Sequence, residues 1–286
     1  MLPFKKILFP VDYSDRSKSI LPYVQETVGH FSAQLTLVHA YGVGVLPYTE
    51  LAVADPNWPE EVRRREEQRL REFAAETFPG QRVDSIVEEG EPGIAIDKVV
   101  QHQGADLVMM PTHGRGPVRR LLLGSVTAKV LHDVSAAVWT GAGRMLDNHP
   151  HNISYKSILC AVDLSDETEA VVRAAAALAA SYHAHLSLVH VVELPPPNVD
   201  VDFTPFREEL IDAANDRLRE LKSQLGIDAP HTSVDGMTAD GVCHEAIQKE
   251  ADLLVVGRGR AQGTLSRIWS RLYAIVRESP CPVLSI

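Results

Sequence analysis

The feature of this sequence that most constrains its fold is an internal duplication. The segment KKILFPVDYSD at residues 5–15 returns as YKSILCAVDLSD at residues 155–166, and this correspondence pairs Asp12 with Asp163. An LVH segment follows at a matching distance in each half. A chain that carries two copies of one unit predicts two domains of the same fold.

The duplication sets the expected domain boundaries. A length of 286 residues suits two domains of ordinary size. We expect one domain over residues 1–146 and a second over residues 153–286. The polar segment between them contains Pro150, which is typical of a linker.

Within each copy, short apolar segments typical of buried strands alternate with segments typical of helices. KILFPV at 6–11 is such a strand, and VVRAAAALAA at 171–180 has high helix propensity. A Ser-Asp pair follows each first strand, which is typical of a helix N-cap. The alternation predicts two tandem doubly wound, Rossmann-like α/β domains, each a five-stranded parallel sheet with helices on both faces.

Charge and composition exclude several classes of function. The formal charge of −10 at pH 7 provides no basic surface for duplex nucleic acid or anionic lipid. No apolar segment is long enough to span a bilayer, and the first residues lack the features of a secretory signal. Three widely spaced cysteines indicate reduced thiols. We therefore expect a cytoplasmic protein with no nucleic-acid and no membrane partner.

Candidate binding residues follow the strand ends of the first copy. In open parallel sheets, ligands bind beyond the carboxyl ends of the strands, where the winding reverses. Asp12 ends the first strand, Ala40 the second, and the segment 111–116 the fourth. The fold would bring these three positions to one edge.

The loop after the fourth strand has features of a phosphate site. Gly114 and Gly116 allow close backbone approach to a ligand, and a helix begins at Gly124-Ser125, where unpaired N–H groups favour anions. In the alternative interpretation, Ser125 caps the helix and the glycines serve the turn. The loop is not a Walker A motif, because the sequence has no Gly-Lys-Ser/Thr.

Two further side chains of the first copy have two interpretations each. Asp12 could accept hydrogen bonds from ribose hydroxyls, or it could be a turn carboxylate that bonds to Ser14 and Asp15. His113 lies inside the loop, where it could contact a phosphate or simply pack.

We expect the remaining polar residues to have structural roles and to take no part in metal binding or catalysis. His39 and His190 end paired strands and are expected to be structural. The His-x-His segments at 149–151 and 183–185 have no further metal ligands beside them. The segment RRREEQRLRE at 63–72 predicts a solvated helix face with i,i+4 ion pairs. No nucleophile–base pair indicates catalysis.

In the order ILFPVDYSD, LTLVHA, GADLVMMPTHGRG and LLLGSVTAKVLHDV, the chain resembles the universal stress protein family in its tandem two-domain form. The resemblance covers nearly the whole chain, once per half, and implies a fold like that of the adenine nucleotide alpha hydrolases. The family motif G-x2-G-x9-G-S/T is associated with ATP or related adenine nucleotides. Here Pro111 replaces its first glycine and removes one N–H, which implies weakened or adjusted binding.

The resemblance also implies a contact for each site residue. Asp12 would hold the ribose, and the backbone of Ala40 would meet the adenine edge. The residues that would line the pocket or pack beside the sugar are Pro10, Val11, Met110 and Pro111. The residues that would bind the phosphates, with His113 in the same loop, are Gly114, Gly124, Ser125 and Val126.

The second half departs from the motif. Gly257 is retained, but Arg260, Ser270 and Arg271 stand where the second glycine, the third glycine and the serine belong. The arginines could block the pocket with their own charge and leave a structural pseudo-domain. They could instead hold an anion by charge-assisted hydrogen bonds.

Two functional hypotheses follow. The first is an ATP-binding protein of stress response or signalling, with the nucleotide in the N-terminal domain, Mg²⁺ accompanying the phosphates, and at most slow ATP hydrolysis. The second is a nucleotide-independent interaction scaffold that pairs through its last strands, as a homodimer or an intrachain pseudo-dimer. An adenylyl-transferring enzyme is disfavoured, because PVDYSD provides no phosphate loop after the first strand.

Overall fold

The structure is a computed structural model that describes residues 3–42, 57–113, 123–141, 153–193, 206–259 and 265–286. Among the described residues, the chain divides into two compact units, a first over 3–113 and 124–138 and a second over 123 and 139–286, and this boundary falls within the strand Ala137–Gly141, which is described with the first unit. The expected end of the first domain at residue 146 and the expected linker residue Pro150 lie outside the described residues. Each unit is described by itself below.

The first unit has the alternating α/β order that the sequence predicts. Its strands follow the order β3-β2-β1-β4-β5. The strands are β1 Lys6–Pro10, β2 Gln34–Tyr41, β3 Val83–Glu89, β4 Leu107–Pro111 and β5 Ala137–Gly141. The helices are α1 Asp15–Ser19, α2 Leu21–Phe31, α4 Trp58–Thr77, α5 Pro92–Gln103 and α6 Ser125–Asp133.

The second unit repeats the order of the first, with its strands arranged β10-β9-β6-β7-β8. The strands are β6 Ser157–Ala161, β7 His185–Val192, β8 His231–Asp235, β9 Leu253–Val256 and β10 Val283–Ser285. The helices are α7 Thr168–Tyr182, α8 Arg207–Leu225, α9 Thr238–Gln248 and α10 Leu265–Glu278. The prediction of two copies of one doubly wound fold is confirmed.

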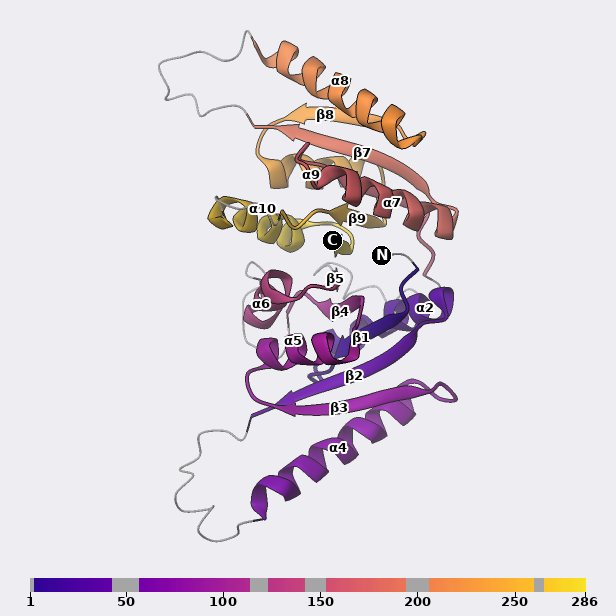
Figure 1. Ribbon diagram of the computed structural model, residues 1–286, viewed down its shortest axis with the longest axis vertical. Helices are drawn as coiled ribbons and strands as arrows, with labels where there is room; N and C mark the ends of the chain where they lie inside the picture. Colours follow the sequence, from indigo (N-terminus) through magenta and orange to yellow (C-terminus); the bar gives the residue numbers. More distant parts are fainter. Residues whose placement is uncertain (1–2, 43–56, 114–122, 142–152, 194–205, 260–264) are drawn as a thin grey trace. The chain divides into compact units, whose positions relative to one another are not determined.

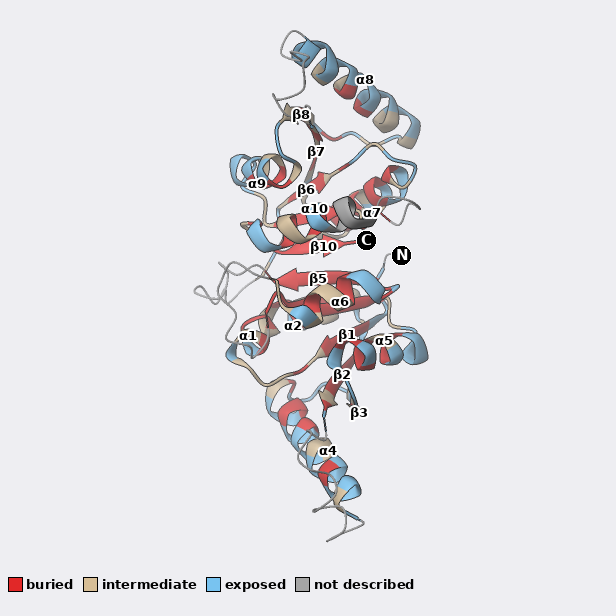
Figure 2. Ribbon diagram, turned by 90° about the vertical axis from the view of Figure 1, so that its left-hand side faces the viewer, coloured by how far each residue is buried: buried red, intermediate tan, exposed pale blue. Residues whose placement is uncertain are grey.

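Parallel pairing and helix packing explain why the strands read as continuous apolar segments. β1 pairs in parallel with β2 and with β4, and β6 pairs in parallel with β7 and with β9. In Figure 1, α4 lies along β3, and α5 and α6 lie side by side; the same pairs are in contact. Figure 2 shows the strands largely buried and the helices exposed on one side. Helices on both faces remove both sides of the strands from water.

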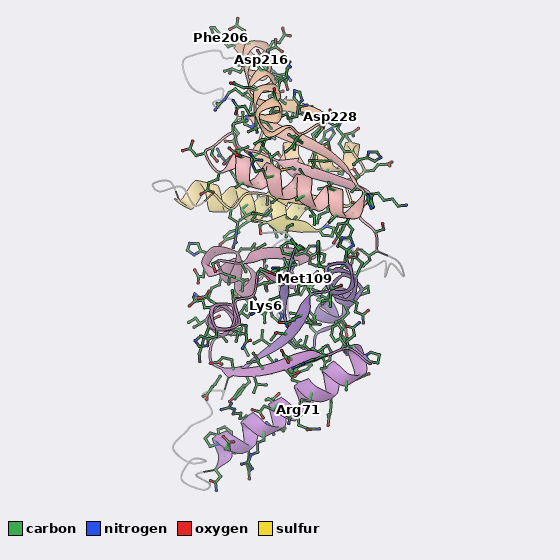
Figure 3. All side chains as sticks on the ribbon, turned by 45° about the vertical axis from the view of Figure 1, so that its right-hand side comes forward. Lys6, Arg71, Met109, Phe206, Asp216 and Asp228 are labelled. Carbon is green, nitrogen blue, oxygen red and sulfur yellow. The ribbon has the colours of Figure 1, made fainter. Side chains whose placement is uncertain are left out.

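The arginine side chains of the segment at 63–72 lie on the exposed face of α4, as expected. Arg63 and Glu67 form an ion pair at 3.1 Å, and Arg71 reaches the same carboxylate at 3.6 Å. Figure 3 labels Arg71 on this helix. On the opposite side of α4, Leu70 and Phe73 are buried. An amphipathic helix of this kind packs through its apolar stripe and keeps its charges in water.

The two Ser-Asp pairs behave differently at the helix starts. Ser14 caps α1, and its hydroxyl accepts the amide of the third residue along at 3.1 Å, as predicted. The prediction that Ser165 caps a helix is wrong, because α7 begins only at Thr168. The Ser165 hydroxyl donates to Asp163 Oδ1 at 2.7 Å, as the hydroxyl of the capping Ser14 does to Asp12, so this bond does not account for the missing cap.

Two further observations concern membrane-spanning helices and the cysteines. None of the described helices combines the length and the apolarity needed to cross a membrane. The three cysteines are free and buried, and burial raises the pKa of each thiol to about 12. Thiols with such pKa values stay protonated near neutral pH and are poor nucleophiles.

Candidate functional site

A cavity of about 340 Å³ lies at the carboxyl ends of β1, β2 and β4. This is where the strand order turns from β1 to β4, the usual ligand position in such folds. Its lining includes ten of the eleven residues that the sequence singled out, while Gly114 lies outside the described residues. These ten are Pro10, Val11, Asp12, Ala40, Met110, Pro111, His113, Gly124, Ser125 and Val126.

Helix α6 begins at the edge of this cavity without a side-chain cap. Gly124 is the N-cap residue and Ser125 is the first helical residue, and no side chain accepts a hydrogen bond as a cap there. The alternative interpretation, in which Ser125 caps the helix, is therefore wrong. The first amides of a helix lack intrahelical partners and carry the positive end of the helix dipole. The cavity thus has a built-in preference for an anion at this end.

The start of α6 is tied to the end of β4 by two hydrogen bonds. The Gly124 amide donates to the Thr112 carbonyl oxygen at 3.0 Å, and Thr127 Oγ1 donates to the Pro111 carbonyl oxygen at 3.1 Å. A Cβ at Gly124 would lie 3.1 Å from the same Thr112 oxygen and 3.4 Å from His113 Cα. Only a residue without a side chain lets the helix start approach the loop this closely.

Asp12 has an internal role besides its place in the cavity. Its Oδ1 accepts the Ser14 amide at 2.9 Å and the Ser14 hydroxyl at 2.6 Å. The expectation that Asp12 is a turn carboxylate bonded to Ser14 is confirmed. Between the two, Tyr13 has a φ of +60°, and Leu164 has a φ of +59° at the corresponding place in the second half. The same left-handed turn follows the strand-end aspartate in both copies.

The paired strand-end histidines have a structural role, as expected. His39 Nδ1 lies 2.6 Å from the Val11 carbonyl oxygen, and His190 Nδ1 lies 2.8 Å from the Val162 carbonyl oxygen. Each imidazole therefore fixes the backbone beside a strand-end aspartate. Both rings also line the cavity of their own unit.

His113 packs at the cavity wall with little exposure. Its Nδ1 lies 3.1 Å from Thr112 Oγ1. Burial lowers the pKa of His113, and the nearby Arg16 lowers it further. The neutral imidazole is therefore favoured at neutral pH.

The structure adds lining residues that the sequence did not reveal. Most come from helices that cover the cavity, and α5 contributes two of them because it follows β3 and packs over β1 and β2. The sequence of α5 gives no indication of its place over the site. The added residues are Ser17, Val38, Pro92, Ile96 and Thr127, with His39 assigned beforehand to structure alone.

The second unit holds a cavity of about 320 Å³ at the matching place. Asp163 Oδ1 accepts hydrogen bonds there from the Ser165 amide at 3.0 Å, the Ser165 hydroxyl at 2.7 Å and Thr168 Oγ1 at 2.9 Å. Burial works to raise the pKa of Asp163, but these hydrogen bonds outweigh it, so the pKa is lowered. The carboxylate therefore stays charged at neutral pH.

An ion pair stands at the edge of the second cavity. Arg271 pairs with Glu193, and the same carboxylate accepts hydrogen bonds from the Thr238 hydroxyl and, at 3.4 Å, from the Thr238 amide. By the register of the duplication, Arg271 corresponds to Ser125. The substitutions thus leave a cavity, and the charge of Arg271 is neutralised by the protein's own carboxylate. Arg260 lies outside the described residues.

The helix that follows β9 starts earlier than its counterpart. α10 begins at Leu265, whereas Ser270 is the residue that corresponds to the N-cap Gly124. Residues 270 and 271 therefore lie within the helix, where amides bond to carbonyl groups one turn back. The second cavity lacks the open helix start that the first cavity has at this position.

No cluster of three or more histidine, cysteine or acidic side chains suited to a metal ion occurs among the described residues. The segment 149–151 lies outside them.

Comparison with known proteins places each half in one family. The family model described as "Universal stress protein family" matches residues 3–140 and again residues 154–286. The two matches together cover most of the chain and repeat in the same order as the two copies.

Curated relatives match about half of this chain. A universal stress protein from Thermus aquaticus is 31% identical over 137 residues, which are 47% of this chain and 96% of that protein. Universal stress protein A homolog 1 from Coxiella burnetii is 32% identical over 139 residues, which are 46% of this chain and 96% of that protein. Each relative is therefore similar to one copy.

Solved structures resemble the whole tandem chain in fold. A universal stress protein from Archaeoglobus fulgidus matches 98% of this chain and 95% of its own with a TM-score of 0.67 at 20% identity. A functionally unknown protein from Pseudomonas aeruginosa matches 99% of this chain and 92% of its own with a TM-score of 0.67 at 16% identity. At such identities the likeness concerns the fold alone.

Proposed function

Because this chain belongs to the universal stress protein family, with one family domain in each half, we propose that it binds ATP in the cavity of its first half. The bound nucleotide would serve stress response or signalling in the cytoplasm. The domain boundaries that we propose for this function, 1–146 and 153–286, assign one complete cavity to each half.

The observation that carries the proposal is the uncapped start of α6 at the cavity edge. Gly124 leaves the first amides of the helix without a side-chain acceptor, and two hydrogen bonds fix this start against β4. Helix starts of this kind bind phosphate through N–H groups and the dipole. The phosphates would meet Gly124, Ser125 and Val126, with Gly114 expected to join them.

The other end of the cavity suits a nucleoside. Asp12 would accept the ribose hydroxyls, while the Ala40 backbone would meet the adenine edge. Met110 and Pro111 would pack beside the sugar, and their side chains are buried in the cavity wall. Pro111 has no N–H to offer, and its carbonyl oxygen already accepts the bond from Thr127. We therefore propose weaker binding than a glycine at this position would give.

Mg²⁺ would accompany the phosphates, since this ion binds phosphate oxygens and keeps much of its own water. Among the described lining residues of the first cavity, Asp12 is the only carboxylate. Its Oδ1 is engaged by Ser14. Because the single carboxylate of this lining already accepts two hydrogen bonds from Ser14, we propose at most slow hydrolysis.

The melting temperature of the chain, followed during an ATP titration, tests the proposal. A ligand that binds only the folded state raises stability, by about 2.7 kcal/mol at 100 times its Kd. We expect a shift that Asp12→Ala and Ser125→Ala reduce, and ATP or ADP in the mass spectrum of gently purified protein. The absence of any shift at millimolar ATP would favour the nucleotide-independent scaffold, with pairing as a homodimer or within the chain.

A further inference from the structure

The two cavities match at the nucleoside end. They have similar volumes, about 340 and 320 Å³, and each has a strand-end aspartate, Asp12 or Asp163, beside a histidine that fixes the backbone. The apolar wall from the helix after the third strand is also kept, with Ile96 in the first cavity and Val242 in the second.

The two cavities differ at the phosphate end. In the second, Ser270 and Arg271 lie within α10, so their amides are not at a helix start. Arg271, the one arginine or lysine in the described lining, is paired with Glu193. Among the described lining residues, this end therefore offers a phosphate neither an open helix start nor an arginine that is free of a carboxylate partner, which disfavours phosphate binding.

We propose that the second cavity binds a nucleoside that carries no phosphate. This inference rests on the proposed function in one respect, because it takes the first cavity as the nucleotide-binding member of the pair. Asp163 Oδ2 takes none of the three bonds that hold Oδ1, and it accepts the ribose hydroxyls. The ring packs between apolar side chains, which are Val162, Val191, Val242, Val256, Leu272 and Ile275.

In this arrangement, Glu193 sets the specificity of the second cavity. It neutralises Arg271 from the end of β7 and is held in place by Thr238 at the start of α9. Replacing its carboxylate by an amide removes one negative charge and leaves Arg271 to pair with an anion. The variant Glu193→Gln should therefore admit phosphorylated ligands to the second cavity.

Matched variants of the full chain separate the two cavities. Ile96→Trp fills the first cavity and Val242→Trp fills the second, since the two residues occupy corresponding positions. Adenosine and ATP are titrated by calorimetry into both variants, and thermal melting checks that each is folded. We expect Ile96→Trp to bind adenosine at one per chain and to bind ATP at least about tenfold more weakly than adenosine.

Two further variants test the named side chains in the Ile96→Trp background. Asp163→Asn should weaken adenosine binding about tenfold or more, because it removes a charged acceptor. Glu193→Gln should strengthen ATP binding about tenfold and leave adenosine binding within about threefold. If Val242→Trp does not fold, Asp163→Asn replaces it as the variant in which ligand binding to the second cavity is weakened.

The outcomes distinguish this inference from the proposed function. ATP that binds the Ile96→Trp chain as tightly as adenosine does would overturn the inference, and so would the absence of adenosine binding to that chain. Adenosine binding that is unchanged by Asp163→Asn would also overturn it. If ATP fails to bind the Val242→Trp chain while adenosine binds the Ile96→Trp chain, the inference is supported and the proposed function fails.

Discussion

Thr127 donates a hydrogen bond from Oγ1 to the carbonyl oxygen of Pro111 at 3.1 Å. The bond joins the second position beyond the start of α6 to the last residue of β4, and both residues line the first cavity. Thr127 is nearly inaccessible to solvent, at 2% exposure. The bond therefore holds the helix start at the edge of the cavity without competition from water.

Replacing this threonine by valine should weaken ATP binding. Thr127→Val keeps the side-chain shape but removes the donor, so we expect a loss of about 1–2 kcal/mol in the free energy of unfolding. ATP affinity should fall several-fold, because the helix start is no longer fixed. Denaturant titration and calorimetry measure the two effects.

A matched control is available in the same unit. Thr27 is also buried and donates to a backbone carbonyl, that of Tyr23, at 2.8 Å within α2. Thr27→Val should lower stability by a similar amount and leave ATP affinity unchanged. If both variants reduce ATP affinity equally, the effect is one of general stability and the role of Thr127 is disproved.

Asp12 should matter for the nucleotide more than for the fold. We expect Asp12→Ala to lower ATP affinity about tenfold or more, because a charged acceptor for ribose hydroxyls is lost. The loss of the bonds to Ser14 should also cost about 1 kcal/mol of stability. Asp84→Ala is the control, since Asp84 is exposed on β3 and absent from the cavity lining. Equal ATP affinity in the wild type and Asp12→Ala would contradict the assignment.

Two glycine-to-alanine substitutions should have opposite effects. At Gly124 the new Cβ would press on the Thr112 carbonyl oxygen at 3.1 Å, so the loop and the α6 start must separate. We expect Gly124→Ala to lower both stability, by about 1 kcal/mol, and ATP affinity. Gly29 lies in α2 with nothing within 4 Å of its added Cβ. Gly29→Ala should stabilise the chain by about 0.5–1 kcal/mol through helix propensity and leave ATP binding unchanged.

The stability of the first unit should depend on pH through His113. Its pKa is lowered by burial and by Arg16, so below the ordinary histidine value the unfolded chain binds more protons than the folded chain. The free energy of unfolding should therefore be fully developed above about pH 7 and fall as the pH drops towards about 5. His113→Gln should reduce this slope, as denaturant titrations at several pH values would show.

A second histidine provides the comparison for that measurement. The pKa of His231 is also lowered, by burial first and then by Lys222 and Arg219. His231 belongs to β8 of the second unit and is remote from the first cavity in the chain. His231→Gln should thus also reduce the pH dependence of stability, and it should leave ATP affinity unchanged. A pH slope that is the same in the wild type and His113→Gln would exclude the assigned pKa shift.

The elements and the first cavity could be largely predicted from the sequence because parallel strands bring their carboxyl ends together. Asp12, Ala40 and Gly124 are far apart in the chain, yet Asp12 lies just beyond β1, Ala40 lies near the end of β2 and Gly124 opens α6. Strand periodicity and helix-start chemistry are local properties, and they were sufficient to locate these positions. Ser165 shows the limit of such rules, because it makes the same bond to its strand-end aspartate as Ser14 does, yet the helix that follows it begins only at Thr168.

Contacts between distant segments could not be predicted in this way. Ile96 lines the first cavity because of how α5 packs after the winding reverses, and its own sequence neighbourhood only indicates a helix. The Arg271–Glu193 pair joins side chains 78 positions apart. The early start of α10 could not be predicted either. It places Arg271 inside a helix, whereas the corresponding Ser125 is the first residue of α6.

The left-handed backbone at Tyr13 and Leu164 has a consequence for how the two copies could diverge. Neither residue is a glycine, so each holds a conformation that costs about 1–3 kcal/mol and persists only because its surroundings impose it. The main chain itself therefore sets the orientation of each strand-end aspartate. After a gene duplication, the other residues of each cavity can therefore change one at a time, because the backbone keeps the strand-end aspartate in the same orientation whichever ligand binds.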